Sequence, residues 1–456
     1  LLANGVAVVN RSIKYHRPRG IAGGGAEEPN AIFQIGTGAS TLPDQRATQV
    51  ELYDGLEARS INGWPGLGLD IGAGIGMASR FLPPGFYYKT FMRPKMLWPL
   101  YERTLRLAAG LGVSPKEQDP DRYERMDVHC DVLVAGGGPA GLAAALEAGR
   151  TGARVILADE QAELGGSLLA SREAIDGAPG MEWVAKALDE LAAMEEVRLL
   201  TRTTAFGYYD HNFLGLVERV TDHVPRNTQK RPRERLWRVR ARQVVLATGA
   251  IERPLVFANN DRPGVMLASA VSTYLNRYGV APGSQAVVFA NNDSAYRTAL
   301  DMADAGITVS AVVDVRAEPG GDLPSQVRAR GIVTLGGHAV ADVLGRNRVK
   351  AVKVVRLSAS GDAIEGPAQK ISCDLVAVSG GWNPTVHLHA QSGGKPRFDV
   401  EKGCFVPGDP MQAERSTGAC TGAFALGSCL AEGSAAGASA AQAAGFGNGN
   451  VPGGAP

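Results

Sequence analysis

The chain has 456 residues, enough for about three domains and a substantial buried core. Its 47 basic and 46 acidic side chains leave a net charge of +1, so no overall charge attracts nucleic acid or an acidic membrane surface. No run of about 18 apolar residues is present, so no membrane span is predicted. Five cysteines without a CxxC motif indicate neither a disulfide framework nor a thiolate metal site. We expect a cytoplasmic protein, and both ends of the sequence resemble cut ends.

The first 125 residues are irregular, with many glycine, proline and aromatic residues. Short apolar runs at Val6–Val9 and Ala31–Ile35 predict strands between turn residues. Leucine and tyrosine residues near helical spacing predict a helix over Leu97–Gly112. The polar segment Pro115–Glu124 is typical of a linker to the next domain.

From residue 130 onward the pattern alternates between apolar strands and Ala-rich helices, which is typical of an α/β fold. Strands followed by turns are predicted at Cys130–Ala135, Gln285–Ala290 and Leu375–Ser379. A fourth strand, Ala423–Gly427, is predicted to lead into a tightly packed Ala/Gly-rich helix. After that helix the chain becomes a tail of glycine and proline.

A dinucleotide-binding motif lies where the first of these strands meets its helix. Gly136, Gly138 and Gly141 form GxGxxG, in which the glycines permit a tight turn, approach of a pyrophosphate and close helix packing. Pro139 lies inside the motif, where free N–H groups at the helix start favour a phosphate. Asp159 ends the next predicted strand, 18 residues beyond Gly141, where a carboxylate accepts hydrogen bonds from a ribose. An acid at this position favours NAD or FAD over NADP.

Later segments resemble the two-dinucleotide-domain architecture of flavin-linked reductases. In that architecture Thr248 and Gly249 return the chain to the first nucleotide domain, and Thr203–Phe206 contacts the adenine. FAD-binding members present a carboxylate to the ribityl hydroxyls from a late Gly-Asp pair, which here is Gly427-Ser428. Because NAD has no ribityl chain, the missing carboxylate favours NAD, although a serine hydroxyl could replace it.

A second strand–helix–strand unit spans Gln285–Asp314, with the turn Asn291–Ser294 in place of the glycines. A side chain at Asn292 would crowd a pyrophosphate that approaches the backbone. We therefore expect this half not to bind a dinucleotide in the ordinary pose. The turn is interpreted as structural, with the alternative that its side chains bind a partner or the phosphate of another flavin.

Three other features have simple interpretations. The basic segment Arg226–Arg242 alternates along a predicted strand, which favours a solvated hairpin or a subunit contact over a nucleic-acid patch. His387 and His389 have no acid or cysteine at ligand spacing, so no metal site is predicted. Since no GxSxG motif or supported Cys-His pair is present, no catalytic residue is assigned.

Several longer motifs are distinctive: Arg11–Ile21, Glu27–Asn30, Arg46–Leu56, Asn62–Pro65, Gly85–Met92, Ala247–Pro254, Asn291–Tyr296 and Ser379–Pro384. These motifs resemble the α subunit of heterotetrameric sarcosine oxidase, and the likeness covers essentially the whole chain. The same scaffold serves N-methylglutamate dehydrogenase and opine, proline or cyanide-forming dehydrogenase complexes.

The resemblance implies an α/β fold with a two-dinucleotide-binding domain of flavin-reductase type behind a ferredoxin-like α+β domain. The ferredoxin-like domain would span 1–125, the NAD-binding Rossmann-like domain 126–255 with 385–445, the degenerate second domain 256–384, and a tail 446–456. Some relatives hold a [2Fe–2S] cluster in the first part, which needs four thiolates at plant-type spacing. Since no cysteine precedes Cys130, we expect a cluster-free domain.

The resemblance also implies NAD on this chain, FAD on a β subunit and covalent FMN near the interface between them. The partners would be β, γ and δ subunits, with no nucleic acid and no membrane. Sarcosine, oxygen and water would give glycine, formaldehyde and hydrogen peroxide, with the amine-oxidising residues on another subunit. The predicted cofactor-binding residues are Gly136, Gly138, Pro139, Ala140, Gly141, Asp159, Glu160, Gln161, Gly166, Ser167, Ala205, Thr248, Gly249, Ala425, Gly427 and Leu430.

Two alternatives remain open. The chain could be the FAD-binding subunit of a related amine, opine, proline or N-methylglutamate dehydrogenase complex, or a scaffold whose nucleotide only stabilises the fold. Family α subunits continue into a folate-binding aminomethyltransferase-like domain, which these residues do not contain.

Overall fold

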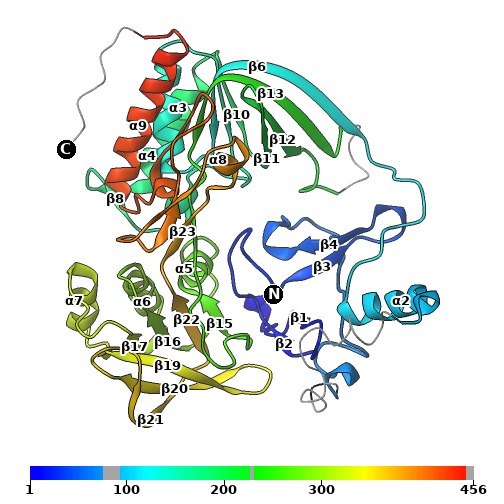
Figure 1. Ribbon diagram of the computed structural model, residues 1–456, viewed down its shortest axis with the longest axis vertical. Coiled ribbons are helices and arrows are strands. Elements are labelled where there is room, and N and C mark those ends of the chain that lie inside the picture. The colour runs from blue at the N-terminus through cyan, green and yellow to red at the C-terminus, as the bar shows by residue number, and fades with distance from the viewer. Residues whose placement is uncertain (75, 77–92, 226–230, 448–456) are drawn as a thin grey trace. The chain divides into compact units, whose positions relative to one another are not determined.

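The computed structural model describes residues 1–74, 76, 93–225 and 231–447 (Figure 1). The chain divides into two compact units, one made of residues 1–120 and 254–381 and the other of residues 121–253 and the chain from residue 382 onward. Each unit is therefore built from two separate stretches of sequence. The motif Gly85–Met92, the basic residues Arg226 and Lys230, and the tail beyond residue 447 lie outside the described residues.

The unit that carries the glycine motif is built on a seven-stranded sheet in the order β10-β7-β6-β13-β12-β11, with β26 beside β13. β10, β7, β6, β13 and β26 run parallel, whereas β12 and β11 continue the sheet antiparallel. The strands are β6 (Tyr123–Ala135), β7 (Val155–Ala158), β10 (Val197–Leu200), β11 (Thr203–Tyr209), β12 (Phe213–Arg219), β13 (Glu234–Leu246) and β26 (Glu414–Ser416).

Three helices pack against this sheet through a core of valine, leucine and alanine side chains. They are α3 (Pro139–Arg150), α4 (Gly180–Ala192) and α9 (Leu426–Ala443), and α3 and α9 lie side by side (Figure 1). The smaller elements of the unit are β8 (Ala174–Ile175), β9 (Ala178–Pro179), β14 (Ala250–Glu252), β23 (Trp382–Pro384), α8 (His387–Gln391), β24 (Arg397–Asp399), β25 (Cys404–Val406) and the 3₁₀ helices η6 (Gly166–Leu169) and η8 (Gly418–Thr421).

The other unit contains a five-stranded parallel sheet in the order β15-β22-β16-β17-β18 and an antiparallel sheet, β19-β20-β21. The elements are β15 (Val265–Leu267), α5 (Ala268–Asn276), β16 (Gln285–Ala290), α6 (Ser294–Asp304), β17 (Thr308–Asp314), α7 (Asp322–Ala329), β18 (Thr334–Gly336), β19 (His338–Gly345), β20 (Val349–Leu357), β21 (Ile364–Ser372) and β22 (Leu375–Ser379). The predicted strands at 285–290 and 375–379 are confirmed with these bounds.

The N-terminal stretch belongs to this same unit, and three of its side chains complete the core formed by the parallel sheet, α5 and α6. Val9, Ile21 and Ala31 are buried in that core. The N-terminal elements are β1 (Asn10–Arg11), β2 (Pro18–Arg19), β3 (Ile32–Ile35), β4 (Leu42–Arg46), β5 (Ala58–Ser60) and α2 (Trp98–Ala109), with the 3₁₀ helices η1 (Leu2–Asn4), η2 (Gly38–Ser40), η3 (Ala47–Gln49) and η5 (Lys95–Leu97). The predicted helix over 97–112 and the strand over 31–35 are confirmed within these bounds.

Two strand predictions are wrong. Val6–Val9 forms no strand. Val9 is apolar because it is buried in the core, and regular strand pairing begins at the next residue, in β1. Ala423–Gly427 forms no strand either, because the polar segment Glu414–Ser416 takes the place beside β13 and α9 begins at Leu426.

The start of β6 also differs from the prediction. The strand begins at Tyr123, inside the expected linker, because its exposed first half pairs with β13 through the backbone without an apolar pattern.

Candidate functional site

The loop between β6 and α3 makes a turn that requires glycine at two positions. Gly136 has a φ of +108°, and a Cβ atom there would lie 2.2 Å from the carbonyl oxygen of Ala247. A Cβ atom on Gly141 would lie 1.8 Å from the carbonyl oxygen of Gly136. The folded chain itself therefore requires these two glycines, whether or not a nucleotide is bound.

Gly138 differs because the space beside it is open. Among the described residues, a Cβ atom on Gly138 would come within 4 Å of one atom, the Cα of Gly166 at 3.7 Å. Gly138 is also the N-cap of α3, and no side chain caps the helix. An uncapped helix N-terminus beside a residue without a side chain is the arrangement that receives a phosphate. Pro139 follows as the first residue of the helix, where its missing N–H costs nothing.

Asp159 follows β7 and is tied into the glycine loop. Its Oδ2 accepts a hydrogen bond from the N–H of Gly137 at 2.7 Å, and its Oδ1 accepts one from the N–H of Gln161 at 2.8 Å. Each carboxylate oxygen keeps acceptor capacity for a further donor such as a ribose hydroxyl. The neighbouring Glu160 uses its backbone carbonyl to accept a 2.7 Å hydrogen bond from the Arg219 guanidinium.

Gly166 and Ser167 begin η6, which lies directly against the glycine loop. The N–H of Gly165 donates to the carbonyl of Gly137 at 2.8 Å, and a Cβ atom on Gly166 would lie 2.6 Å from the Cα of Gly138. Gly166 has a φ of +54°, and the Ser167 side chain is exposed. These two predicted residues therefore lie beside the open space at Gly138.

The predicted residues on β11 and after β13 are held by backbone hydrogen bonds. The N–H of Thr203 donates to the carbonyl of Asp159 at 2.7 Å, which places β11 and the half-buried Ala205 near Asp159. The hydroxyl of Thr248 donates to the carbonyl of Thr385 at 2.7 Å, and the N–H of Thr385 donates to the carbonyl of Gly249 at 2.9 Å. Thr248 and Gly249 therefore shape the turn next to Gly136 through contacts within the protein.

The first turns of α9 pack against the first turn of α3, backbone on backbone. A Cβ atom on Gly433 would lie 2.2 Å from the carbonyl oxygen of Ala140. The Ala140 side chain is 6% exposed, so a ligand would reach this residue through its backbone N–H. Ala425 is the N-cap of α9 without a side-chain capping bond; Ala425 and Gly427 are exposed, and Leu430 is half-buried. The structure thus packs α9, through Gly433, against the start of α3.

Sequence reasoning missed Glu432, the only acid in α9. Its Oε2 accepts hydrogen bonds from the N–H of Gly418 at 3.1 Å and from the hydroxyl of Thr421 at 2.8 Å. Glu432 therefore holds η8 against α9. Its isolation as a single charge in an Ala/Gly-rich segment was the signal that could have found it.

In the other unit, Asn292 closes the turn that replaces the glycine motif. Its Nδ2 donates to the hydroxyl oxygen of Ser379 at 2.9 Å, and its Oδ1 accepts from the N–H of Ser294 at 3.1 Å. The Asn292 side chain therefore uses its amide nitrogen and oxygen in hydrogen bonds within the protein.

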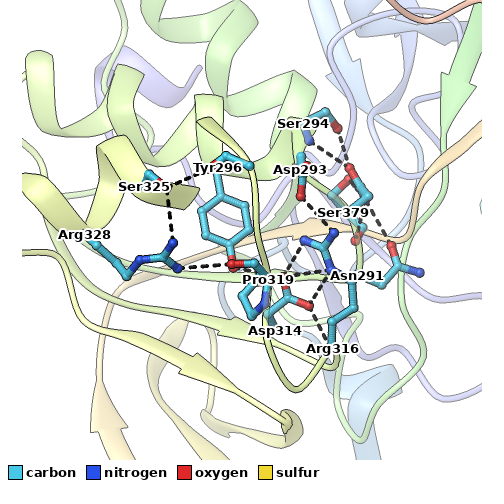
Figure 2. Close-up of polar contacts among 12 residues, drawn as sticks. Asn291, Asp293, Ser294, Tyr296, Asp314, Arg316, Pro319, Ser325, Arg328 and Ser379 are labelled. Carbon is cyan, nitrogen blue, oxygen red and sulfur yellow. Dashed lines mark hydrogen bonds and ion pairs between the residues drawn. The ribbon is translucent and has the colours of Figure 1, made fainter. Parts of the chain in front are cut away.

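The acid at the end of the second strand of this unit is also engaged. Asp314 is fully buried and accepts hydrogen bonds from the hydroxyl of Tyr296 at 2.9 Å and from Arg316 at 2.7 Å (Figure 2). Arg316 bridges onward to Asp293 at 2.8 Å, and its hydrogen bond to Asp314 raises the pKa of the guanidinium. The Asp314 carboxylate is thus buried and engaged by protein donors.

The histidine pair and the basic segment singled out in the sequence make contacts within the protein. The Nδ1 of His389 bonds to Glu414 at 2.7 Å and its Nε2 accepts from the N–H of Gly408, so neither ring nitrogen is available to a metal. Across the described residues, no group of three histidine, cysteine or acidic side chains has the geometry of a metal site. β12 and β13 form an antiparallel hairpin, and its Arg235 pairs with Glu124 and Glu218.

The five cysteines are all buried and none forms a disulfide. Burial raises the pKa of the Cys429 thiol to about 11. Burial likewise raises the pKa of Cys373 to about 12. Because the thiolate is the reactive form, these side chains behave as small apolar groups at neutral pH.

A separate pocket of about 490 Å³ lies between α4 and β10 in the unit that carries the glycine motif. It contains none of the predicted site residues and its walls are mainly apolar, including Leu164, Met181, Val184 and Leu188. Within the described residues, no helix is both long enough and apolar enough to cross a membrane.

Comparison with known proteins adds family information to this geometry. Residues 131–221 match the family described as FAD dependent oxidoreductase, and residues 1–63 match the 2Fe-2S iron-sulfur cluster binding domain. Sarcosine oxidase subunit alpha of Rhizobium meliloti (strain 1021) is 49% identical over 436 residues, covering 95% of this chain and 43% of that protein. The corresponding subunit of Corynebacterium sp. (strain U-96) is 41% identical over 456 residues, covering 98% and 42%. The chain therefore spans less than half the length of these curated relatives.

Among solved structures, the L-proline dehydrogenase from P. horikoshii matches with a TM-score of 0.61 at 19% identity, covering 96% of this chain and 68% of that one. Together with the sheet order and the glycine loop, this match defines a nucleotide-binding oxidoreductase fold of the two-dinucleotide type, as predicted. More specifically, the chain is a homologue of sarcosine oxidase subunit alpha, and the resemblance predicted from the motifs is confirmed.

Proposed function

We propose that this chain is the nucleotide-binding portion of the alpha subunit of a multi-subunit, flavin-dependent secondary-amine oxidase. The reaction would convert sarcosine, oxygen and water to glycine, formaldehyde and hydrogen peroxide. In this proposal the chain binds NAD, helps to house FMN at the interface with a beta subunit that carries FAD, and assembles with gamma and delta subunits. The 49% identity to a sarcosine oxidase alpha subunit supports the proposal.

The observation that carries the nucleotide site is the open position at Gly138 on the uncapped N-terminus of α3, next to Asp159. The N–H groups of the first turn would bind the pyrophosphate, and the Asp159 carboxylate would orient the ribose. The exposed Ser167 on η6 offers a further hydroxyl beside that space. NAD is a dinucleotide whose pyrophosphate and ribose would fit these N–H groups, the Asp159 carboxylate and the Ser167 hydroxyl.

The start of α9 favours NAD over FAD at this site. Gly427 and Ser428 are exposed where a flavin-binding chain would present a carboxylate. The nearest acid on the helix, Glu432, is bonded to Gly418 and Thr421 instead. A ribityl chain would therefore find no carboxylate at this position.

The closed second unit supports a structural role for the bound NAD. In a reductase with two nucleotide folds, the second fold delivers the redox partner to the first. Here the hydrogen bond of Asn292 to Ser379 and the burial of Asp314 support the proposal that this unit has no ordinary dinucleotide site. We therefore infer that NAD organises the subunit without turning over, and that this chain supplies no residue to the oxidation of the C–H bond.

The experiment is to denature the purified chain, alone and in its complex, and to identify the released nucleotides by absorbance and mass. NAD without flavin from the chain alone is the expected result. One FAD per chain would overturn the NAD assignment and favour the alternative, the FAD-binding subunit of a related amine, opine, proline or N-methylglutamate dehydrogenase complex. Release of no nucleotide would refute both assignments for this site.

A further inference from the structure

The N-terminal stretch matches a 2Fe-2S cluster-binding domain over residues 1–63, yet the sequence has no cysteine before Cys130. A plant-type cluster loop has three thiolates at C-x₄-C-x₂-C spacing. Placed on the loop after β2, this spacing falls on Gly23, Glu28 and Ala31 when it is centred on Glu28. None of the three residues can ligate iron as a thiolate, so the residues do not fit the cluster that the domain family implies.

The Glu28 carboxylate lies at the centre of this loop and is fully buried. Its Oε2 accepts hydrogen bonds from the N–H groups of Ala22 at 2.7 Å and Gly23 at 2.6 Å. Its Oε1 accepts from the N–H groups of Asn30 at 2.7 Å and Ala31 at 2.9 Å. Two of the four donors, Gly23 and Ala31, are the very positions that the thiolate spacing marks.

Four backbone N–H groups that converge on one point form a nest for an anion. Such nests surround iron–sulfur clusters and phosphates, because partial positive charges of the amides stabilise the bound negative charge. A buried carboxylate is costly unless it is well hydrogen-bonded, and four charge-assisted bonds meet that requirement. The loop therefore retains an anion-binding shape, and its own side chain provides the anion.

The same loop is docked on the nucleotide-like sheet of its unit. The N–H of Leu267, at the end of β15, donates to the carbonyl of Ala22 at 2.8 Å. A Cβ atom on Gly20 would lie 2.7 Å from the Cα of Pro263, and one on Gly24 would lie 3.4 Å from the Cα of Ala270 in α5. The loop conformation that Glu28 fixes is thus the conformation that fits α5 and β15.

We propose that the Glu28 carboxylate takes the structural place of the iron–sulfur cluster, so that this domain has exchanged electron transfer for docking. The anion that organises the loop is covalently part of the chain. The N-terminal domain then serves to complete the core of the second nucleotide-like domain, and electrons do not pass through it.

The test uses the full chain with Glu28→Gln, and with Glu27→Gln as the matched control. Glu27 is the adjacent, half-buried acid, whose Oε1 accepts from the N–H groups of Gly24 and Gly25. Hydrogen exchange, read by mass spectrometry on peptides that cover residues 20–31 and α5, measures how firmly the loop is held. We expect Glu28→Gln to accelerate exchange at 22, 23, 30 and 31 by about tenfold or more, and to extend the effect into α5. Glu27→Gln should affect residues 24 and 25 alone.

Unchanged protection at those four amides in Glu28→Gln would overturn the proposal. If Glu28→Gln does not fold, Glu28→Asp replaces it, because the shorter carboxylate keeps the charge and cannot reach both pairs of donors. Iron analysis provides an independent arm. The wild-type chain, incubated anaerobically with ferrous iron and sulfide and then desalted, should retain no iron, whereas about two irons per chain would refute the replacement.

Discussion

The substitution Gly138→Ala tests nucleotide affinity separately from the stability of the fold. The added methyl group meets only the Cα of Gly166 among the described atoms, at 3.7 Å, and the backbone at φ −76° and ψ −173° suits alanine. The nucleotide-free variant should therefore keep its free energy of unfolding, or gain up to about 1 kcal/mol from a stiffer unfolded chain. Gly141→Ala is the contrast, because its methyl group would lie 1.8 Å from the carbonyl oxygen of Gly136 and should prevent correct folding.

The same methyl group should oppose the pyrophosphate. Overfilling a fitted contact costs about 1–3 kcal/mol, which corresponds to a loss of affinity of about 5- to 150-fold. Isothermal titration of the nucleotide-free chain with NAD measures this loss, and thermal unfolding without ligand measures the fold. Gly320→Ala serves as the control, since its Cβ atom has nothing described within 4 Å. If Gly138→Ala binds NAD as tightly as the wild type does, the pyrophosphate does not lie at this helix.

Three further predictions follow from the hydrogen bonds of single side chains. Asp159→Asn should weaken NAD binding by about tenfold or more in the same titration, because a charged acceptor of the ribose is lost; unchanged affinity would refute the ribose assignment. Asn292→Gly should destabilise the chain by about 1–2 kcal/mol, measured by urea unfolding, because the bond to Ser379 is lost, and it should not create a second NAD equivalent. The hydrogen bond from Arg154 lowers the pKa of the buried Asp131 below its ordinary value, so its stabilisation is present above about pH 4 and is lost as the pH falls further. Asp131→Asn should therefore cost about 1–2 kcal/mol at pH 7, with a gap to the wild type that narrows in acid; a constant gap from pH 7 to pH 2 would contradict this reasoning.

The glycine loop could be predicted because each of its features is local. The order of strand, glycines, helix and acid fixes the turn, and the structure places Gly136, Gly141 and Asp159 accordingly. The strand beside β13 could not be predicted, because Glu414–Ser416 has no apolar alternation and is recruited by backbone pairing with a segment far away in sequence. The apolar run Val6–Val9 was wrongly predicted as a strand, because a residue such as Val9 can be buried in a core without pairing in a β-sheet.

Local sequence patterns also could not predict that the N-terminal stretch packs into the core of the parallel sheet, α5 and α6. Val9, Ile21 and Ala31 join a core with helices more than two hundred residues later, and their spacing carries no signal of it. Glu28 was visible only as part of a quoted motif, because a charged residue gives no indication that four backbone amides will surround it. The closed turn at Asn292 was predicted from the absence of glycine, but its bond to Ser379 depends on a strand more than eighty residues away.

The packing of α9 on α3 sets the order of events during synthesis. Gly433 and Gly437 contact the backbone of Ala140 and Ala144, so the glycine-loop helix lacks its neighbour until residues near 440 have left the ribosome. By then both stretches of the other unit, residues 1–120 and 254–381, have already been made. That unit can thus fold first, whereas residues 121–253 complete their fold only when the segment from residue 382 onward is available. The pairing of Glu252 with Trp382 then joins the two stretches of the glycine-motif unit, so the proposed nucleotide site would form late in maturation.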